Sequence, residues 1–368
     1  MSDNWRRYYT IHAALKRLYP GEPHGNLARH LKTLALLICG IVGSRRTNLP
    51  AITGKCPRQV KEESQTKQFA RWVANAHIDA TLYFLPYAAA LLDSLAHRAL
   101  VLVMDSSTVG RDCLALMVSV LYHGRALPLA WVVVEGTAGH MAEATHSALL
   151  AQVQPLLPAG ATVIFLGDGE FDGPGLQATL NGYGWQYVCR TAKSVILIEA
   201  GAEFSFRDVG PDRGQRISLP GVLFTRQGYG PVHAAAWWRK DCAEPIYLVS
   251  NLDLAAEIFY WYGRRFQIET FFSDQKSRGF HIHKSHLSDP ARLARLLIAA
   301  CLAYIWIVNL GARALQEGWI WTIHRTERCD LSLFQAGLRL LEYLLDQVKP
   351  IPVAFRMPEL VGFQKSVR

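Results

Sequence analysis

The sequence predicts an α/β fold preceded by a helical segment and interrupted by a β-rich one. Two apolar runs, residues 99–104 and 161–167, each end at an aspartate, as buried strands of an open α/β sheet do. Residues 1–90 show helical periodicity instead, and residues 191–250 alternate between short strand patterns and Gly-rich turns. We therefore expect a central sheet with flanking helices, a separate N-terminal helical domain and an inserted β-rich domain. The expected boundaries are residues 1–90, 91–190, 191–250, 251–310 and 311–368.

The composition is that of a globular protein with a localised positive charge. The chain has 368 residues, enough for two or three domains, and 50% of them are hydrophobic against 19% charged. Its net charge is +9, but residues 1–90 hold 13 Lys/Arg against 5 Asp/Glu, whereas the remainder holds 26 against 25. This asymmetry predicts that the N-terminal domain lies on a phosphodiester backbone.

Neither disulfides nor a membrane span are expected. The seven cysteines are scattered without a close pair, which indicates free thiols in a reducing compartment such as the cytoplasm. The longest apolar run, Leu296–Val308, has 13 residues and is shorter than a span requires. We expect it to form a helix buried behind the central sheet.

The N-terminal segment predicts two helices joined by a basic loop. The periodic stretch 27–42 is followed by the loop 44–50 and by a polar helix near 59–74. Such a pair can place one helix in a DNA groove. Arg45 and Arg46 in the loop are candidates for phosphate contact, with a solvated charged face as the alternative. Further candidates are Lys55, Arg58, Lys61, Lys67 and Arg71.

The first strands of the central sheet are expected in residues 91–190. The strand ending at Asp105 leads into a polar turn, Ser106–Thr108, and two further strands near 113–122 and 126–134 flank the turn 123–125. A helix near 141–153, the strand ending at Asp168, a helix near 174–180 and a strand near 185–190 complete this part.

Two acids compete with Asp168 for a role at the end of its strand. Glu170 and Asp172 lie within four residues of it, and Asp172 precedes Gly173-Pro174, which is typical of a helix N-cap. Either aspartate, 105 or 168, could alternatively serve only to open a turn.

The β-rich segment contains an aromatic and cationic cluster. Trp237 and Trp238 precede Arg239 and Lys240, and such aromatic rings can stack on an unpaired base. The alternative is that these tryptophans are strand core.

The segment from Tyr262 to Lys276 carries the clearest pattern. A helix is expected to begin near Leu254, and at about 100° per residue Arg265, Glu269 and Lys276 fall at about −60°, −20° and −40° from Tyr262. Glu269 can bind a hard cation, while Arg265, Lys276 and Tyr262 can contact phosphate oxygens on either side. An ordinary amphipathic helix is the alternative.

The remaining patterns point less clearly to function. His281, His283 and His286 could bind a transition metal or continue the basic surface beyond Lys276. A stripe of apolar residues in 331–347 is typical of core, and less often of a dimer seam.

The motif Tyr262-x2-Arg265-x3-Glu269-x6-Lys276, preceded by Asp105 and Asp168, resembles the DDE transposases of bacterial insertion sequences. More narrowly, it resembles the class with the Tyr-Arg-Glu-Lys (YREK) signature, and the likeness extends from about residue 100 to about 310. The resemblance implies an RNase H-like fold with a β-rich insertion. It also implies that Asp105, Asp168 and Glu269 are the catalytic acids and metal ligands.

Mg²⁺ is the expected cofactor, with Mn²⁺ able to substitute, because three carboxylates suit hard divalent cations. The resemblance implies hydrolysis at the ends of an insertion sequence and joining of the 3′-hydroxyl ends to target DNA, by a homodimer on duplex DNA. Two alternatives remain open: a transposase-derived DNA-binding protein without catalysis, and an unrelated RNase H-like metal-dependent nuclease.

Overall fold

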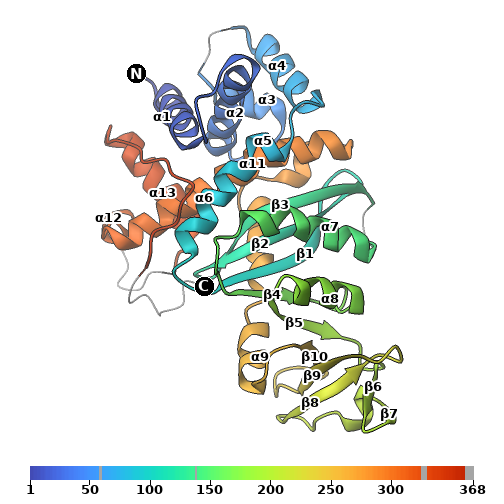
Figure 1. Cartoon of the computed structure of the whole chain (residues 1–368). Coiled ribbons are helices and arrows are strands. Elements are labelled where there is room, and N and C mark those ends of the chain that lie inside the picture. Colours follow the sequence, from blue (N-terminus) through green and yellow to red (C-terminus); the bar gives the residue numbers. More distant parts are fainter. Residues whose placement is uncertain (58–59, 137–138, 325–329, 361–368) are drawn as a thin grey trace.

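The protein is an α/β molecule built around one large mixed sheet (Figure 1). The computed structural model describes residues 1–57, 60–136, 139–324 and 330–360. Within these ranges the sheet has ten strands in the order β3-β2-β1-β4-β5-β10-β9-β8-β6-β7. Their bounds are β1 Leu100–Gly110, β2 Cys113–Tyr122, β3 Arg125–Glu135, β4 Val163–Gly167, β5 Gln186–Thr191, β6 Ile196–Glu199, β7 Ala202–Ser205, β8 Arg216–Phe224, β9 Tyr229–Trp237 and β10 Ile246–Ser250.

The first five strands have the connections expected of the central sheet. β1, β2 and β3 are antiparallel neighbours, whereas β4 and β5 run parallel to β1. The β2–β3 turn is tight because His123 and Gly124 both have positive φ, 42° and 80°, which suits a two-residue hairpin. Crossover connections carry α7 (Glu143–Val153), η1 (Gln154–Leu156) and α8 (Pro174–Gly182). This arrangement is consistent with a transposase of RNase H-like fold.

The β-rich segment joins the same sheet and does not form a sheet of its own. The strands expected in 191–250 are present, but β10 pairs with β5 on one side and with β9 on the other. The pairing continues through β8 and β6 to β7, with the short helix η2 (Phe206–Val209) between β7 and β8. The sheet therefore runs without interruption from the β1–β3 end to the lower end of the molecule in Figure 1.

The N-terminal segment is helical, as predicted, but it shares its core with the rest of the chain. Its apolar side chains belong to the same buried cluster as those of the sheet. In particular, α2 and α4 pack against the long helix α11 (Pro290–Gln316). The N-terminal helices are α1 Asp3–Leu18, α2 Gly25–Ser44, α3 Leu49–Gly54, α4 Glu62–Ala74, α5 Ala80–Tyr83 and α6 Leu85–Leu95.

Helix α11 lies at the centre of the molecule. It packs against β3, α2, α4 and α13 (Leu333–Asp346), and every residue from Leu296 to Ala312 is buried. A helix that is apolar on all sides is a core helix. Both α2 and α11 are long and apolar enough to cross a membrane, but most of α11 and more than half of α2 is buried within the protein.

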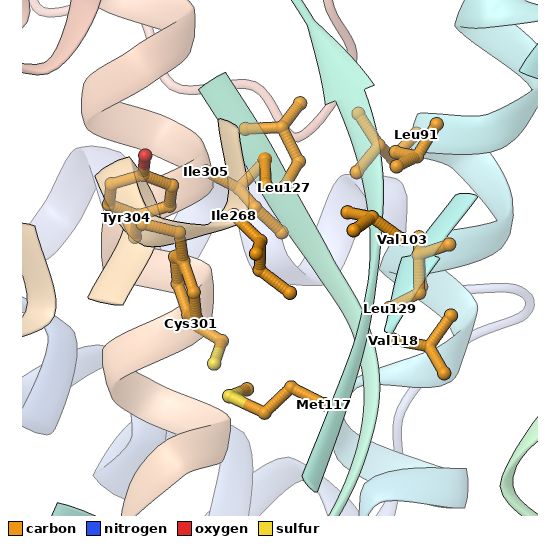
Figure 2. Close-up of a cluster of buried hydrophobic side chains, with 14 of the residues drawn as sticks. Leu91, Val103, Met117, Val118, Leu127, Leu129, Ile268, Cys301, Tyr304 and Ile305 are labelled. Carbon is orange, nitrogen blue, oxygen red and sulfur yellow. The ribbon is translucent and has the colours of Figure 1, made fainter. Parts of the chain in front are cut away.

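Figure 2 shows how the strands and helices interlock. Buried side chains of β1, β2 and β3 meet Leu91 of α6 on one side and side chains of α10 (Gln267–Gln275) and α11 on the other. Ile268 anchors α10 in this core. The labelled residues are Leu91, Val103, Met117, Val118, Leu127, Leu129, Ile268, Cys301, Tyr304 and Ile305.

The described residues of the C-terminal region include α12 (Ile320–Ile323), α13 and the segment 349–360, which is neither helix nor strand. The apolar stripe of α13 is buried against α11, so the stripe predicted in 331–347 belongs to the core and not to an exposed seam. Gly337 permits this close approach, because a Cβ at this position would lie 1.8 Å from the Ile307 carbonyl oxygen.

Candidate active site

Asp105 lies within β1, two residues beyond the last pair that β1 forms with β4. The polar turn predicted at Ser106–Thr108 is wrong: β1 continues to Gly110, because this stretch stays paired with β2 through Leu114–Met117. The parallel pairing with β4 ends earlier, at Val103 opposite Leu166. Extending this register by two residues sets Asp105 opposite Asp168.

Asp168 directly follows the last residue of β4, as predicted for a strand-end acid. Its Oδ1 accepts a hydrogen bond from the backbone N–H of Glu170 at 3.0 Å. This bond fixes the direction in which the chain leaves the strand. Two acids therefore lie at the same edge of the sheet, on neighbouring parallel strands.

The two rival acids have other partners. Glu170 is nearly buried, contacts His146 Nε2 at 3.2 Å and accepts a bond from the Met141 N–H at 2.7 Å. Asp172 is not a helix cap: the N-cap of α8 is Gly173, and Asp172 accepts a hydrogen bond from the Thr191 hydroxyl at 2.6 Å. These bonds favour Asp168 as the second acid of the site.

The signature segment is not one continuous helix, and that prediction is wrong. Four residues separate α9 (Ala255–Tyr262) from α10, and the backbone bonds donated between Arg264 and Glu269 span three residues instead of four. The tighter winding has 3.0 residues per turn, and Gly263 at its start weakens an α-helix. The single stripe calculated for Tyr262, Arg265, Glu269 and Lys276 therefore does not describe their placement.

Arg265 joins two of the three acids. Its Nη1 lies 3.3 Å from Asp105 Oδ2, and its Nη2 lies 3.9 Å from Glu269 Oε1. Only 8% of the Arg265 side chain is exposed, and its guanidinium stacks on the ring of Phe266 at 4.4 Å. Arg265 was predicted to contact phosphate. In this conformation it contacts two carboxylates.

The pKa of Asp105 shows that both other acids act on this carboxyl. Burial, followed by the charge of Asp168, raises the pKa of Asp105 to about 6, although the Arg265 charge opposes the shift. Glu269 also raises the pKa of this carboxyl. A carboxylate that two neighbouring acids repel lies in surroundings that are chemically suited to a hard divalent cation.

The carboxylates are not yet arranged around one ion. Within the described ranges, no three carboxylate, imidazole or thiolate side chains are positioned to surround a metal. Asp105 is 18% exposed, whereas Glu269 is 62% exposed and lies in the first turn of α10. Glu269 therefore lies at the exposed side of the acid cluster, and Asp105 at its buried side.

Lys276 ties the end of α10 to β1. Its Nζ donates hydrogen bonds to Ser107 Oγ at 2.6 Å and to Thr108 Oγ1 at 3.3 Å, and burial lowers its pKa. Side chains two residues apart on a strand share a face, so Ser107 and Asp105 lie on the same side of β1. Ser107 was predicted only as part of a turn, so this contact was missed.

Tyr262 is 2% exposed, so its hydroxyl is not presented to solvent in this conformation. Burial raises the pKa of Tyr262, the nearby Arg265 charge opposes the shift, and the hydroxyl has no hydrogen-bond partner of good geometry. Tyr262 packs behind Arg265, and its predicted contact with phosphate stays a prediction.

Two residues outside the signature hold α10 against the β2–β3 hairpin. The Arg125 Nη1 lies 3.0 Å from Asp274 Oδ2, and both side chains are at most 5% exposed. Tyr304 donates a weaker bond to the same oxygen at 3.4 Å, and burial raises the pKa of Asp274 to about 6. No sequence pattern indicated this pair, because its partners are 149 residues apart.

The other DNA-contact candidates do not contact the acids. Trp237 is half-buried between Arg216, at 4.3 Å, and Arg239, at 5.5 Å. Trp238 donates its indole N–H to the Cys242 carbonyl at 3.2 Å. Arg45 forms an exposed ion pair with Glu342, and Arg46 lies beside the segment that follows α10. Arg58, another basic candidate, lies outside the described residues.

One comparison with known proteins identifies a family. The family described as the transposase DDE domain matches residues 96–306. No curated protein matches the chain. The piggyBac transposase synaptic complex with hairpin DNA is 12% identical, with a TM-score of 0.45, over 98% of this chain and 84% of that one. Human ENDOV is 16% identical, with a TM-score of 0.28, over 58% and 96%.

The family match covers more than half of the chain and includes Asp105, Asp168 and Glu269. The chain belongs to the family of transposases with a DDE domain.

Proposed function

We propose that this transposase belongs to the bacterial insertion-sequence class with the YREK signature. It binds the ends of its element, cleaves them by metal-dependent hydrolysis and joins the 3′-hydroxyl ends to target DNA. The observation that carries the proposal is the proximity of Asp105 on β1 to Asp168, which directly follows the parallel neighbour β4, with Glu269 linked to Asp105 through Arg265. This is an acid cluster at the edge of a sheet where α/β proteins bind ligands.

The residues have separate tasks in the proposed reaction. Asp105, Asp168 and Glu269 hold Mg²⁺, or Mn²⁺ in its place, which when bound supplies charge stabilisation for the attacking and leaving oxygens. Water attacks the phosphorus at the element end and releases a 3′-hydroxyl. This hydroxyl then attacks a target phosphodiester, so each bond formed at phosphorus replaces one that breaks.

The cations of the signature act on charge and position. Arg265 lies between two of the acids, where its charge limits their repulsion. Lys276 is hydrogen-bonded to β1 two and three residues beyond Asp105, from where it can contact a phosphate of the cut strand. We place the protein in the bacterial cytoplasm, at the nucleoid, as a homodimer on duplex DNA.

The test is incubation of the full chain with candidate terminal inverted repeats and Mg²⁺, followed by sequencing of the products. We expect joined products from the wild type, and neither cleavage nor joining from Asp105→Asn, Asp168→Asn or Glu269→Gln, with end binding retained. Cleavage without joined products would identify a nuclease, and end binding without cleavage would identify a catalytically silent derivative. Either result would overturn the proposal.

A further inference from the structure

A small cationic pocket lies where the N-terminal helices meet the segment after α10. The loop between α2 and α3 contributes Arg46 and Asn48, and the segment around η3 (Ile282–Lys284) contributes His281, Lys284 and His286. The buried Thr47 hydroxyl donates to the His281 carbonyl at 3.1 Å and so joins the two segments at the pocket.

The pocket has positive charge without a compensating acid. Two full cations, two imidazoles and one amide line it, and no carboxylate is among its lining residues. Within the described part of the chain, the side chains of Arg46 and Lys284 make no ion pair or hydrogen bond, whereas Arg45 next in the chain is paired with Glu342. Such a cluster attracts an anion.

The backbone supports a role in binding. His281 and His286 have φ of 54° and 62°, a left-handed conformation that costs energy in residues other than glycine. The Nδ1 of His281 is buried without a hydrogen-bond partner. The alternative of a metal site is not supported, because the described His, Cys, Asp and Glu side chains form no metal-binding group here.

The size of the pocket limits the ligand. Its volume is about 140 Å³, whereas pockets for drug-sized molecules span roughly 300–1,000 Å³. At roughly 30 Å³ per water, the space equals four to five waters. This volume suits one phosphate group, and a larger ligand would have to extend outside. Arginine recognises phosphate through two parallel hydrogen bonds, and lysine adds a point charge.

We infer that this pocket binds a backbone phosphate of duplex DNA and so fixes the duplex between the N-terminal helices and the active site. This inference rests on the proposed function. The pocket is directly continuous with the signature, because the His281 N–H donates to the Lys276 carbonyl at 3.0 Å while the Lys276 ammonium reaches β1. A phosphate held here therefore has a defined position relative to Asp105.

The test compares single and double charge removal in the full chain. We expect Arg46→Gln and Lys284→Gln together to weaken binding of an element-end duplex about tenfold at moderate salt. The slope of log affinity against log salt should become shallower by about 0.9, the value for one phosphate. Arg207→Gln, which removes an exposed arginine paired with Asp208, is the matched control and should change the slope by less. Fluorescence anisotropy without metal measures binding alone, and thermal melting checks that each variant is folded.

Inorganic phosphate provides the second arm. We expect millimolar phosphate to shift the imidazole NMR signals of His281 and His286 in the wild type and not in the double variant. Unchanged DNA slopes in a folded double variant would overturn the inference, and phosphate-induced shifts in that case would reassign the pocket to free phosphate. If the proposed function fails but the inference holds, the wild type joins no DNA. The pocket variants nevertheless weaken duplex binding.

Discussion

Folding disfavours the ionised form of Asp105 relative to the protonated form. Its pKa rises to about 6 because the carboxyl is buried beside Asp168, and Arg265 offsets only part of this effect. Sites that bind cations commonly hold acids in such unfavourable surroundings, since the energy is recovered when the ligand binds. The stability of the metal-free protein should therefore improve when this acid is removed.

We expect Asp105→Asn to raise the free energy of unfolding by about 1–3 kcal/mol at pH 7.5 in the presence of EDTA. Folding raises the pKa of Asp105. The destabilisation caused by its charged carboxylate therefore grows from about pH 4 to about pH 6 and is constant above pH 6. The gain should therefore shrink at pH 5. Urea unfolding at both pH values measures it, with Asp112→Asn, an exposed acid, as control. A gain of equal size at both pH values would contradict the assignment.

Arg265 should set the pH dependence of cleavage. Its charge lowers the pKa of Asp105, so Arg265→Gln should move the acidic limb of the pH–rate profile to higher pH. Arg265→Lys keeps the charge and should shift the limb less. The neighbouring Arg264, which contacts the ring of Tyr260, provides the control Arg264→Gln. An unshifted limb in Arg265→Gln would show that Arg265 does not act through the acids.

At the scale of elements, the position of α10 depends on a buried ion pair. Arg125 and Asp274 connect α10 to the β2–β3 hairpin, and Thr270 of α10 donates to the Gly124 carbonyl at 3.3 Å. Glu269 lies on the same helix, so these contacts determine where its carboxylate stands. They support α10 in addition to the contact that Lys276 makes with β1.

We expect Asp274→Ala to destabilise the protein by about 3–5 kcal/mol, because it removes the carboxylate that faces a buried guanidinium. The double variant Arg125→Met/Asp274→Leu should recover most of the stability. Chemical denaturation measures both, with the exposed Asp253→Ala as control. A double variant no more stable than Asp274→Ala would show that the pair contributes through its charge and not through packing.

The elements that could be predicted are those with local signals. The β2–β3 hairpin is marked by His123-Gly124, α11 by an uninterrupted apolar run and α13 by apolar periodicity. The extent of β1 could not be predicted, because Ser106–Thr108 is a turn in local propensity and becomes strand only through pairing with β2. The break between α9 and α10 could not be predicted either, because a single glycine, Gly263, does not outweigh the helical periodicity of the residues around it.

The candidate acids could be picked out from the sequence because each one has a local signal: Asp105 ends an apolar run, although β1 continues beyond it. Asp168 follows an apolar strand, and Glu269 belongs to a spaced motif. The contacts of Arg265 and Lys276 were not accessible, because they join residues 160 and 169 positions apart. Partners at such separation are determined by tertiary packing, which a linear pattern does not encode.

At the scale of the whole molecule, one core connects the N-terminal helices to the sheet. The charge asymmetry predicted a separate domain in residues 1–90, but α2 and α4 are packed on α11. A DNA-binding surface in this region is therefore rigidly coupled to the acids.

We expect the full chain to unfold in a single transition monitored by near-UV and far-UV circular dichroism, because one buried cluster joins the N-terminal helices, the sheet and α11. A fragment of residues 1–90 should expose the apolar face of α2 and fail to show a cooperative melt. A cooperatively folded fragment would restore the view of an independent domain, and two separated transitions in the full chain would support the same conclusion.

The packing of α2 on α11 also has a consequence during synthesis. The end of α2 and the start of α11 are separated by about 250 residues. At a translation rate of roughly 5–20 residues per second, α11 is synthesised about 12–50 s after α2, and until then the apolar face of α2 cannot pack on it. Through that interval the nascent chain exposes a surface that chaperones bind. The proposed acid site is likewise assembled late in synthesis, because Glu269 follows Asp105 by 164 residues along the chain.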